Sequence, residues 1–197
     1  MSKGAEEEPG SKPTVLVFAG PNGSGKSTIA KAHPIVGIYV NADDIKRHRG
    51  CSDLEAAQEA ELLRGSLLNS RKDFTFETVL STERNLLLLE NAKRSGYRIE
   101  SVFVLTISAE LNVIRVKTRV QKGGHDVPED KIRKRYSKSL LMLKRLAALS
   151  DECVVIDNTE LPEVIYKKDA DGEIYLSNDY WVEADIKELI IDFSQSY

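Results

Sequence analysis

The chain has 197 residues, of which 41% are hydrophobic and 30% are charged, with 28 basic and 31 acidic side chains and a net charge of −3. This length suits one globular domain with a sizeable core, and the hydrophobic share excludes a wholly disordered chain. A membrane span requires about 20 consecutive apolar residues, and the sequence has no such run. The small negative charge gives no overall reason to expect nucleic acid as a partner.

The first residues and the two cysteines favour a cytoplasmic location. Residues 1–13 are polar and contain no apolar stretch that could act as a secretory signal, so we expect a flexible tail ahead of one domain over residues 14–197. Cys51 and Cys153 lie far apart and form no CxxC pair. This arrangement is typical of reduced thiols in a cytosolic protein rather than of a disulfide or zinc site.

Apolar runs and helical periodicities alternate along the chain. The β-rich runs predict five strands, at residues 14–19, 36–40, 74–79, 102–107 and 153–156. Helical patterns begin near residues 26, 54, 83, 109 and 128. The alternation predicts an α/β three-layer sandwich with a mostly parallel five-stranded sheet. A turn signal at Asp169–Gly172 adds a C-terminal β-hairpin, and a short helix is expected to complete the region 163–197.

A glycine-rich segment follows the first predicted strand and fits the phosphate-binding pattern G-x-x-x-x-G-K-[ST]. Its glycines allow backbone N–H groups to turn toward phosphate oxygens, and the helix that begins near Lys26 adds the positive end of its dipole. We expect Lys26 to reach the β- and γ-phosphates and the Ser27 hydroxyl to bind Mg²⁺. The predicted nucleotide contacts are Gly20, Pro21, Asn22, Gly23, Ser24, Gly25, Lys26, Ser27 and Thr28. The segment therefore predicts a nucleoside-triphosphate site with ATP and Mg²⁺ as cofactors.

Two other classes of protein with this loop lack support in the sequence. Transporter-type ATPases carry a glycine-rich signature before a late apolar strand, whereas residues Arg133 to Ser150 contain no glycine. A GTPase requires an Asn-Lys-x-Asp motif that reads guanine, and the sequence has none. A small phosphotransferase remains.

A kinase requires a base that accepts the proton of the acceptor hydroxyl. Asn41-Ala-Asp-Asp44 directly follows the second predicted strand, where side chains enter the crevice beyond the carboxyl ends of the sheet. Asp43 is therefore the candidate base, and Asp44 a candidate contact to the acceptor. The structural alternative is that either aspartate caps the polar segment that follows.

A basic segment suggests a lid over the phosphates. Nine basic and three acidic residues lie between Arg115 and Lys138, and Arg115 and Arg119 share one helix face. Gly123-Gly124 offers a flexible corner, so residues 109–138 are expected to form a closing helix–loop–helix lid. A solvated charged face is the plainer alternative. An RNA-binding patch is a further one, although Tyr136 is the only aromatic residue among these charges.

Three further sites in the sequence have side chains with more than one interpretation. Glu77 ends the third predicted strand, where it could bind a substrate hydroxyl, orient a magnesium-bound water, or simply satisfy a neighbouring loop. His125 in the glycine corner is more typical of an exposed loop histidine than of a catalytic one. Asp157-Asn158 closes the fifth predicted strand and either borders the adenine or starts a turn.

Several of these motifs together resemble the zeta-toxin family of P-loop kinases. The resemblance covers roughly Val15 to Asn158 and rests on Gly20–Thr28, Asn41–Asp44, Phe76–Ser81 and Gly123–Pro128 with Arg133 and Arg135. It implies a P-loop kinase sheet, use of ATP and Mg²⁺, and phosphorylation of a hydroxyl on a nucleotide sugar, typically UDP-N-acetylglucosamine. An antitoxin protein is the partner that it implies.

The resemblance also assigns roles to individual residues. Lys26 would hold the phosphates, Asp43 would be the base and Arg119 a transition-state cation. Glu77 would contact the acceptor, and the other residues that we expect to bind substrate are Asp44, Thr78, Arg115, His125, Arg133 and Arg135. In one departure, His125 stands where these toxins carry an arginine ahead of the lid proline, so Arg133 or Arg135 would have to replace it. Two other functions stay open: a nucleic-acid-binding ATPase or RNA kinase, and a regulatory ATP-binding protein without catalysis.

Overall fold

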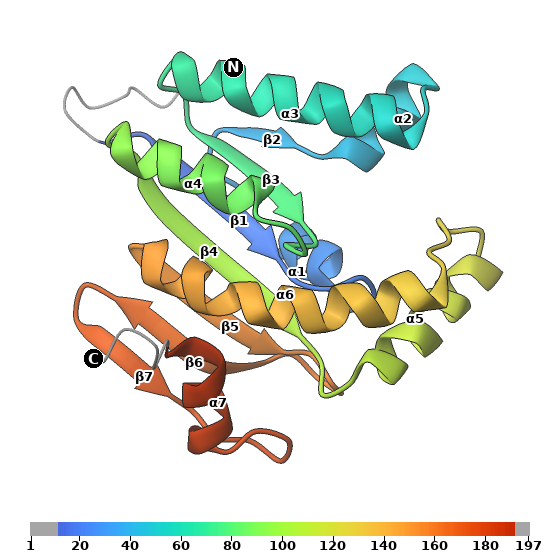
Figure 1. Ribbon diagram of the computed structural model, residues 1–197, viewed down its shortest axis with the longest axis vertical. Helices are drawn as coiled ribbons and strands as arrows, with labels where there is room; N and C mark the ends of the chain where they lie inside the picture. Colours follow the sequence, from blue (N-terminus) through green and yellow to red (C-terminus); the bar gives the residue numbers. More distant parts are fainter. Residues whose placement is uncertain (1–11, 192–197) are drawn as a thin grey trace, which may run out of the picture.

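The computed structural model describes residues 12–191 (Figure 1). Their strands form one sheet in the order β2-β3-β1-β4-β5-β6-β7. The strands are β1 (Thr14–Ala19), β2 (Ile38–Val40), β3 (Phe74–Thr78), β4 (Arg98–Leu105), β5 (Glu152–Asp157), β6 (Glu163–Asp169) and β7 (Gly172–Tyr175). The helices are α1 (Lys26–Ala32), α2 (Ala42–Arg49), α3 (Asp53–Asn69), α4 (Arg84–Arg94), α5 (Ala109–Gln121), α6 (Glu129–Leu149) and α7 (Glu183–Ile190). The α/β class that the sequence predicts is confirmed.

The sheet has seven strands within the described range, rather than five, because the C-terminal hairpin joins it. Strands β1 to β5 pair in parallel, whereas β6 pairs antiparallel with β5 and β7 antiparallel with β6. Ile165 and Tyr166 of β6 are fully buried. The apolar side chains of the hairpin thus extend the core of the sheet instead of packing separately.

Two strands differ from their predicted bounds for local reasons. β2 starts two residues later than expected, because the backbone of Val36 exchanges hydrogen bonds of 2.8 and 2.7 Å with the Thr75 hydroxyl. The chain then turns at Gly37, whose φ is 59°. β4 starts earlier than expected, at Arg98, where its parallel pairing with β1 begins.

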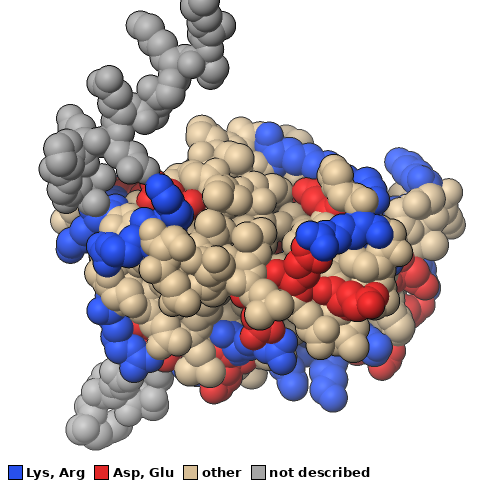
Figure 2. All heavy atoms as spheres, turned by 90° about the horizontal axis from the view of Figure 1, so that it is seen from above, with Lys and Arg blue, Asp and Glu red and all other residues tan. Residues whose placement is uncertain are grey.

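Helix α2 is absent from the sequence-based expectations because its residues are almost all polar. The Asn41 side chain caps it by accepting a hydrogen bond of 2.8 Å from the Asp43 backbone N–H. None of its side chains is buried. Ion pairs hold it to α3 and within itself, namely Lys46–Asp53, Arg47–Asp44 and Arg49–Glu59. Figure 2, which looks onto this end of the molecule, shows acidic and basic side chains lying next to one another.

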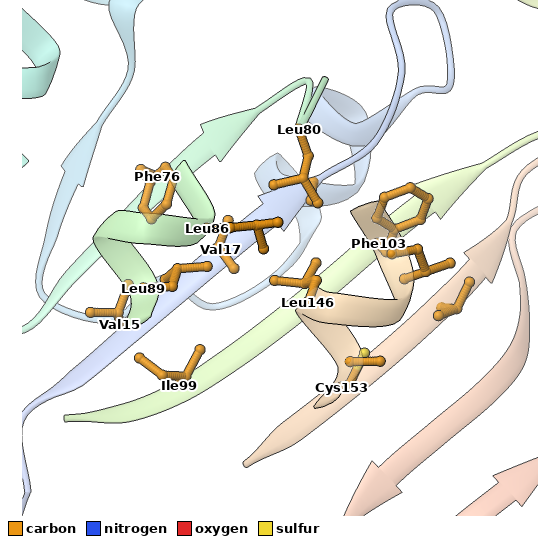
Figure 3. Packing of buried hydrophobic residues seen from close by; sticks show 14 of the residues in the cluster. Val15, Val17, Phe76, Leu80, Leu86, Leu89, Ile99, Phe103, Leu146 and Cys153 are labelled. Atoms are coloured by element: carbon orange, nitrogen blue, oxygen red, sulfur yellow. The ribbon is translucent and has the colours of Figure 1, made fainter. Parts of the chain in front are cut away.

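The helices cover the two faces of the sheet unequally. Val15, Val17 and Ala19 point from β1 into a large core with α3, α4, α6 and α7, whereas Leu16 and Phe18 point into a smaller one against α1. This alternation is the side-chain period of a strand buried on both faces. Figure 3 shows the large core, where helix side chains lie over the strands: Leu86, Leu89 and Leu146 over Val17, Ile99 and Phe103.

The topology brings together the segments that carry the candidate site. β2, β3 and β1 are parallel neighbours, so the segments that follow their carboxyl ends lie at one edge of the sheet. Of the predicted N-terminal tail and the predicted last helix, residues 1–11 and 192–193 lie outside the described residues. No helix between residues 12 and 191 has the length and apolar character that a bilayer span requires.

Candidate functional site

The phosphate-binding loop is held in shape by its backbone neighbours. Gly20, Gly23 and Gly25 have φ values of 141°, 84° and 93°. Residues that have a Cβ atom rarely adopt positive φ values of this kind. A Cβ atom on Gly20 would lie 2.1 Å from the carbonyl oxygen of Val104, and one on Gly23 would lie 2.6 Å from that of Asn112. The loop is therefore fixed between β4 and α5, with α1 beginning directly after it.

Gly25 supplies a test of this loop. Its added Cβ would lie 2.2 Å from Asn158 Nδ2, the atom that donates a hydrogen bond of 2.7 Å to the Ser24 carbonyl. We expect Gly25→Ala to displace Asn158, to strain a positive φ, and to weaken ATP binding about tenfold or more, as measured by calorimetric titration. Gly65→Ala is the matched control, because that glycine lies within α3 with open space around it. The Gly65→Ala control is expected to bind ATP like the wild type. An equal loss of ATP affinity in both variants would contradict a role of Gly25 in the phosphate-binding loop.

Five charged side chains from five elements meet at the start of α1. Lys26 is half-buried, and burial lowers the pKa of its ammonium group. The nearby carboxylates of Glu77 and Asp43 act against this lowering, whereas Arg119 and Arg135 add to it. Lys26 and these four neighbours come from α1, β3, α2, α5 and α6, so the fold gathers predicted site residues from distant parts of the sequence around one ammonium group.

Ser27 and Glu77 provide oxygen atoms beside that ammonium. The Ser27 hydroxyl donates a hydrogen bond of 2.6 Å to Glu77 Oε2. Hydroxyl and carboxylate oxygens are the donors that Mg²⁺ prefers, and Mg²⁺ completes its octahedral shell with phosphate oxygens and water. Ser27 and Glu77 therefore fit a Mg²⁺ ion that is carried by a nucleoside triphosphate.

Two cavities meet at this point. A smaller one of about 340 Å³ lies along the phosphate-binding loop and is lined also by Arg115 of α5 and by Asn158. A larger one of about 1030 Å³ lies between α1, α2 and the corner of the α5–α6 lid. Ser27 and Arg119 line both. The arrangement can hold two molecules that touch each other at Ser27 and Arg119.

The two aspartates of α2 differ in their surroundings. Asn41 caps the helix, so neither Asp43 nor Asp44 has the capping role that the sequence left open. Asp44 accepts a hydrogen bond of 3.0 Å from Arg47. The Asp43 carboxylate is exposed to the larger cavity, and within residues 12–191 it has no hydrogen-bond partner. Of the two aspartates, Asp43 is thus the one whose carboxylate faces the larger cavity without a hydrogen-bond partner among the described residues.

The segment predicted to be the lid, residues 109–138, folds as α5 and the first part of α6, which share an apolar cluster of Val113, Val116, Val127 and Ile132. Arg119 donates a hydrogen bond of 2.6 Å to the carbonyl of His125 in the corner loop. Arg135 of α6 reaches back to the phosphate-binding loop, where its Nη1 lies 3.3 Å from Asn22 Oδ1. Arg135 therefore contacts the phosphate-binding loop, whereas Arg119 is held by the corner loop and lines the cavity beside the phosphate-binding loop.

Other predicted contacts lie elsewhere or are already engaged. Thr78 is buried, and its hydroxyl accepts hydrogen bonds from the Leu80 N–H and the Asn85 side chain. Arg133 pairs with Glu110 and Glu129 and lines neither cavity. Contacts of these two side chains with substrate stay predictions, and they would require those bonds to break.

Arg115 and His125 lie at the edges of the cavities. Arg115 lines the smaller cavity, but its guanidinium donates to the carbonyls of Asn158 and Thr159 at 2.7 and 2.9 Å. His125 is exposed in the lid corner and lines the larger cavity. Asp157 is buried and accepts hydrogen bonds from Thr159, so it closes the turn after β5.

The comparisons with known proteins agree with this geometry. No protein-family model matches the sequence. An uncharacterized protein of Haemophilus influenzae is 28% identical over 127 residues, which are 61% of this chain and 91% of that protein. A chain of the PezAT chromosomal toxin–antitoxin system of Streptococcus pneumoniae superposes with a TM-score of 0.58 at 16% identity, over 99% of this chain and 84% of that one. The chain has a zeta-toxin-like P-loop kinase fold.

A second solved structure supports the same fold. A chain of the AvrRxo1-ORF1:-ORF2 complex with ATP superposes with a TM-score of 0.67 at 18% identity, over 92% of this chain and 64% of that one. The resemblance that the sequence motifs suggest is thus confirmed for the zeta-toxin-like fold.

Sequence reasoning assigned no role to several residues that line the larger cavity of this zeta-toxin-like fold. They are Lys31, His33, Tyr39, Asn41, Lys46, Arg47 and Cys51. Tyr39 carried a usable signal, because side chains alternate along a strand and Val40 of β2 points into the large core. Tyr39 must then point to the opposite face, where the phosphate-binding loop lies.

Cys51 allows the larger cavity to be probed directly. It is half-buried at the cavity wall, whereas Cys153, the other cysteine of the chain, is fully buried and burial raises the pKa of its thiol to about 11. We expect a maleimide to label Cys51 first and a bound acceptor to slow that labelling several-fold. Cys51→Ser removes the fast reaction and is the control. An unchanged labelling rate at saturating acceptor would place the acceptor elsewhere.

Proposed function

We propose that the protein is an ATP-dependent kinase that phosphorylates a hydroxyl group of a small molecule. One observation carries this proposal: an unpaired carboxylate, Asp43, faces the larger cavity and lies near Lys26 of the phosphate-binding loop. The smaller cavity would hold the ATP phosphates and the larger one the acceptor. The zeta-toxin-like fold supports the same assignment.

The side chains where the two cavities meet determine how phosphoryl transfer would proceed. The acceptor oxygen forms a bond to the γ-phosphorus while the bond to the β–γ bridging oxygen breaks, and ADP leaves. Asp43 accepts the hydroxyl proton, and Lys26 holds the β- and γ-phosphate oxygens. Arg119 and Arg135 balance the negative charge that spreads over the transferred group. Mg²⁺, bound next to Ser27, would supply further neutralisation of the phosphate oxygens.

The acceptor that we favour is a nucleotide sugar such as UDP-N-acetylglucosamine. A cavity of about 1030 Å³ lies at the upper end of the range for small-molecule sites, and the sequence motifs resemble those of zeta toxins. An antitoxin protein is the partner we propose, since a structural neighbour belongs to a toxin–antitoxin system. A cytoplasmic location is part of the same proposal, because both cysteines are free thiols.

The test is incubation of the protein with ATP, Mg²⁺ and a panel of nucleotide sugars, nucleosides and short RNA, with mass spectrometry as the readout. We expect a nucleotide sugar to gain one phosphate. A phosphate on an RNA or nucleoside hydroxyl instead would make the acceptor assignment wrong and favour the RNA-kinase alternative. If ATP binds but no acceptor gains phosphate, the regulatory alternative is favoured.

A further inference from the structure

The Glu77 carboxylate accepts hydrogen bonds from three side chains on different segments. Ser27 Oγ donates to it at 2.6 Å from α1, and Asn41 Nδ2 donates at 3.0 Å from the loop after β2. The Tyr39 hydroxyl of β2 is the third donor. Asn41 Nδ2 lies also 3.2 Å from the Tyr39 oxygen, so the four side chains form one connected network beneath the phosphate-binding loop.

The network determines how the Ser27 hydroxyl is oriented. A serine hydroxyl has one proton to donate and two lone pairs. Because its proton is directed to Glu77, the lone pairs point away from that carboxylate and are available to a cation. Without the Glu77 carboxylate as its hydrogen-bond partner, the Ser27 hydroxyl could rotate and present its proton to the cation. Glu77 would therefore influence a bound metal ion through Ser27 as well as through its own charge.

Tyr39 and Asn41 in turn hold Glu77. The Tyr39 phenol donates its proton to Glu77, and a phenol with an ordinary pKa of about 10 is protonated at physiological pH. Asn41 uses both ends of its amide: Nδ2 donates to Glu77, and Oδ1 accepts the Asp43 N–H at 2.8 Å. One side chain thus connects the helix end that carries Asp43 with the carboxylate that orients Ser27.

We propose that Tyr39 and Asn41 are positioning residues for Mg²⁺: they hold Glu77 so that it orients the Ser27 hydroxyl toward the metal carried by ATP. This inference rests on the proposed function, since it requires ATP–Mg²⁺ at the phosphate-binding loop. It assigns Glu77 to the metal side of the site, whereas the sequence resemblance implies a contact with the acceptor.

The test measures how strongly Mg²⁺ enhances the binding of a non-hydrolysable ATP analogue, by calorimetry with and without EDTA and with no acceptor present. Tyr39→Phe keeps the ring and removes the donor. We expect it to reduce the Mg²⁺ enhancement about tenfold, as is typical for groups that orient metal ligands, and to leave binding in EDTA unchanged. Asn41→Ser, which keeps a capping oxygen but cannot donate an amide proton to Glu77, is expected to act in the same direction.

The matched control is Tyr180→Phe. Tyr180 donates to Glu160, the same kind of pair in a part of the chain that lines neither cavity, and its loss should leave the enhancement unchanged. A wild-type enhancement in Tyr39→Phe, or an equal loss of affinity with and without Mg²⁺, would overturn the inference. Absence of nucleotide binding in the wild type would instead overturn the proposed function, so the two failures are distinguishable.

Discussion

Asp43→Asn is expected to lower the rate of phosphoryl transfer about 100-fold or more, which is the usual contribution of a general base, and to leave ATP–Mg²⁺ binding intact. The amide cannot accept the hydroxyl proton, but it keeps the shape of the side chain. Asp43 has no hydrogen-bond partner to lose within residues 12–191, so the fold should be unaffected. Single-turnover kinetics separate this rate from nucleotide affinity.

Asp44→Asn is the control for this experiment. Asp44 lines the same cavity and lies on the same helix turn, but it is paired with Arg47 at 3.0 Å. An exposed pair of this kind contributes little to stability, so the transfer rate at saturating acceptor should remain near the wild-type rate, and loss of the predicted contact with the acceptor would appear in KM. If Asp43→Asn keeps wild-type transfer while Asp44→Asn loses it, the base is the other aspartate.

Arg119→Ala is expected to reduce the transfer rate about 1000-fold or more, as for arginines that stabilise the charge of phosphoryl transfer. Arg119 lines both cavities, and it is held in the lid by the His125 carbonyl at 2.6 Å. Its loss should affect the rate more than the affinity for ATP, because the charge that it balances develops during transfer. The measurement is kcat at saturating ATP and acceptor.

Two further lid variants show whether position or charge alone matters. Arg135→Ala should also lower kcat, because Arg135 reaches Asn22 in the phosphate-binding loop. Arg133→Ala should cause a much smaller loss, because Arg133 pairs with Glu110 and Glu129 outside both cavities. An Arg133→Ala loss equal to that of Arg119→Ala would mean that the lid rearranges and brings Arg133 to the phosphates.

Much of the fold can be predicted from local patterns. The apolar run over 14–19 and the helical pattern that begins near residue 54 both appear where expected, as β1 and α3. The addition of β6 to the edge of β5 could not be predicted, because hairpin turn signals do not say which strand the hairpin joins. Helix α2 was also hidden, since it offers only Ala42 and Ile45 to the core and begins at the Asn41 cap rather than at an apolar periodicity.

The site could be predicted where a motif fixes it and not where tertiary contacts do. The loop motif identifies Lys26 and Ser27, but Glu77 and Thr78 cannot both face them, because successive strand residues point to opposite faces. Strand alternation alone could therefore have excluded one of the two. Arg133 and Arg135 likewise lie on different faces of α6, and only the packing of α6 shows which one faces Asn22.

The most direct test of the central claim is a calorimetric titration of ATP into the wild-type protein with and without Mg²⁺. The claim is that the loop from Gly20 to Thr28 holds the triphosphate next to Asp43. It predicts binding of one ATP per chain that Mg²⁺ strengthens and that Gly25→Ala weakens. Absence of ATP binding in the presence of Mg²⁺, by protein that is fully folded, would contradict it.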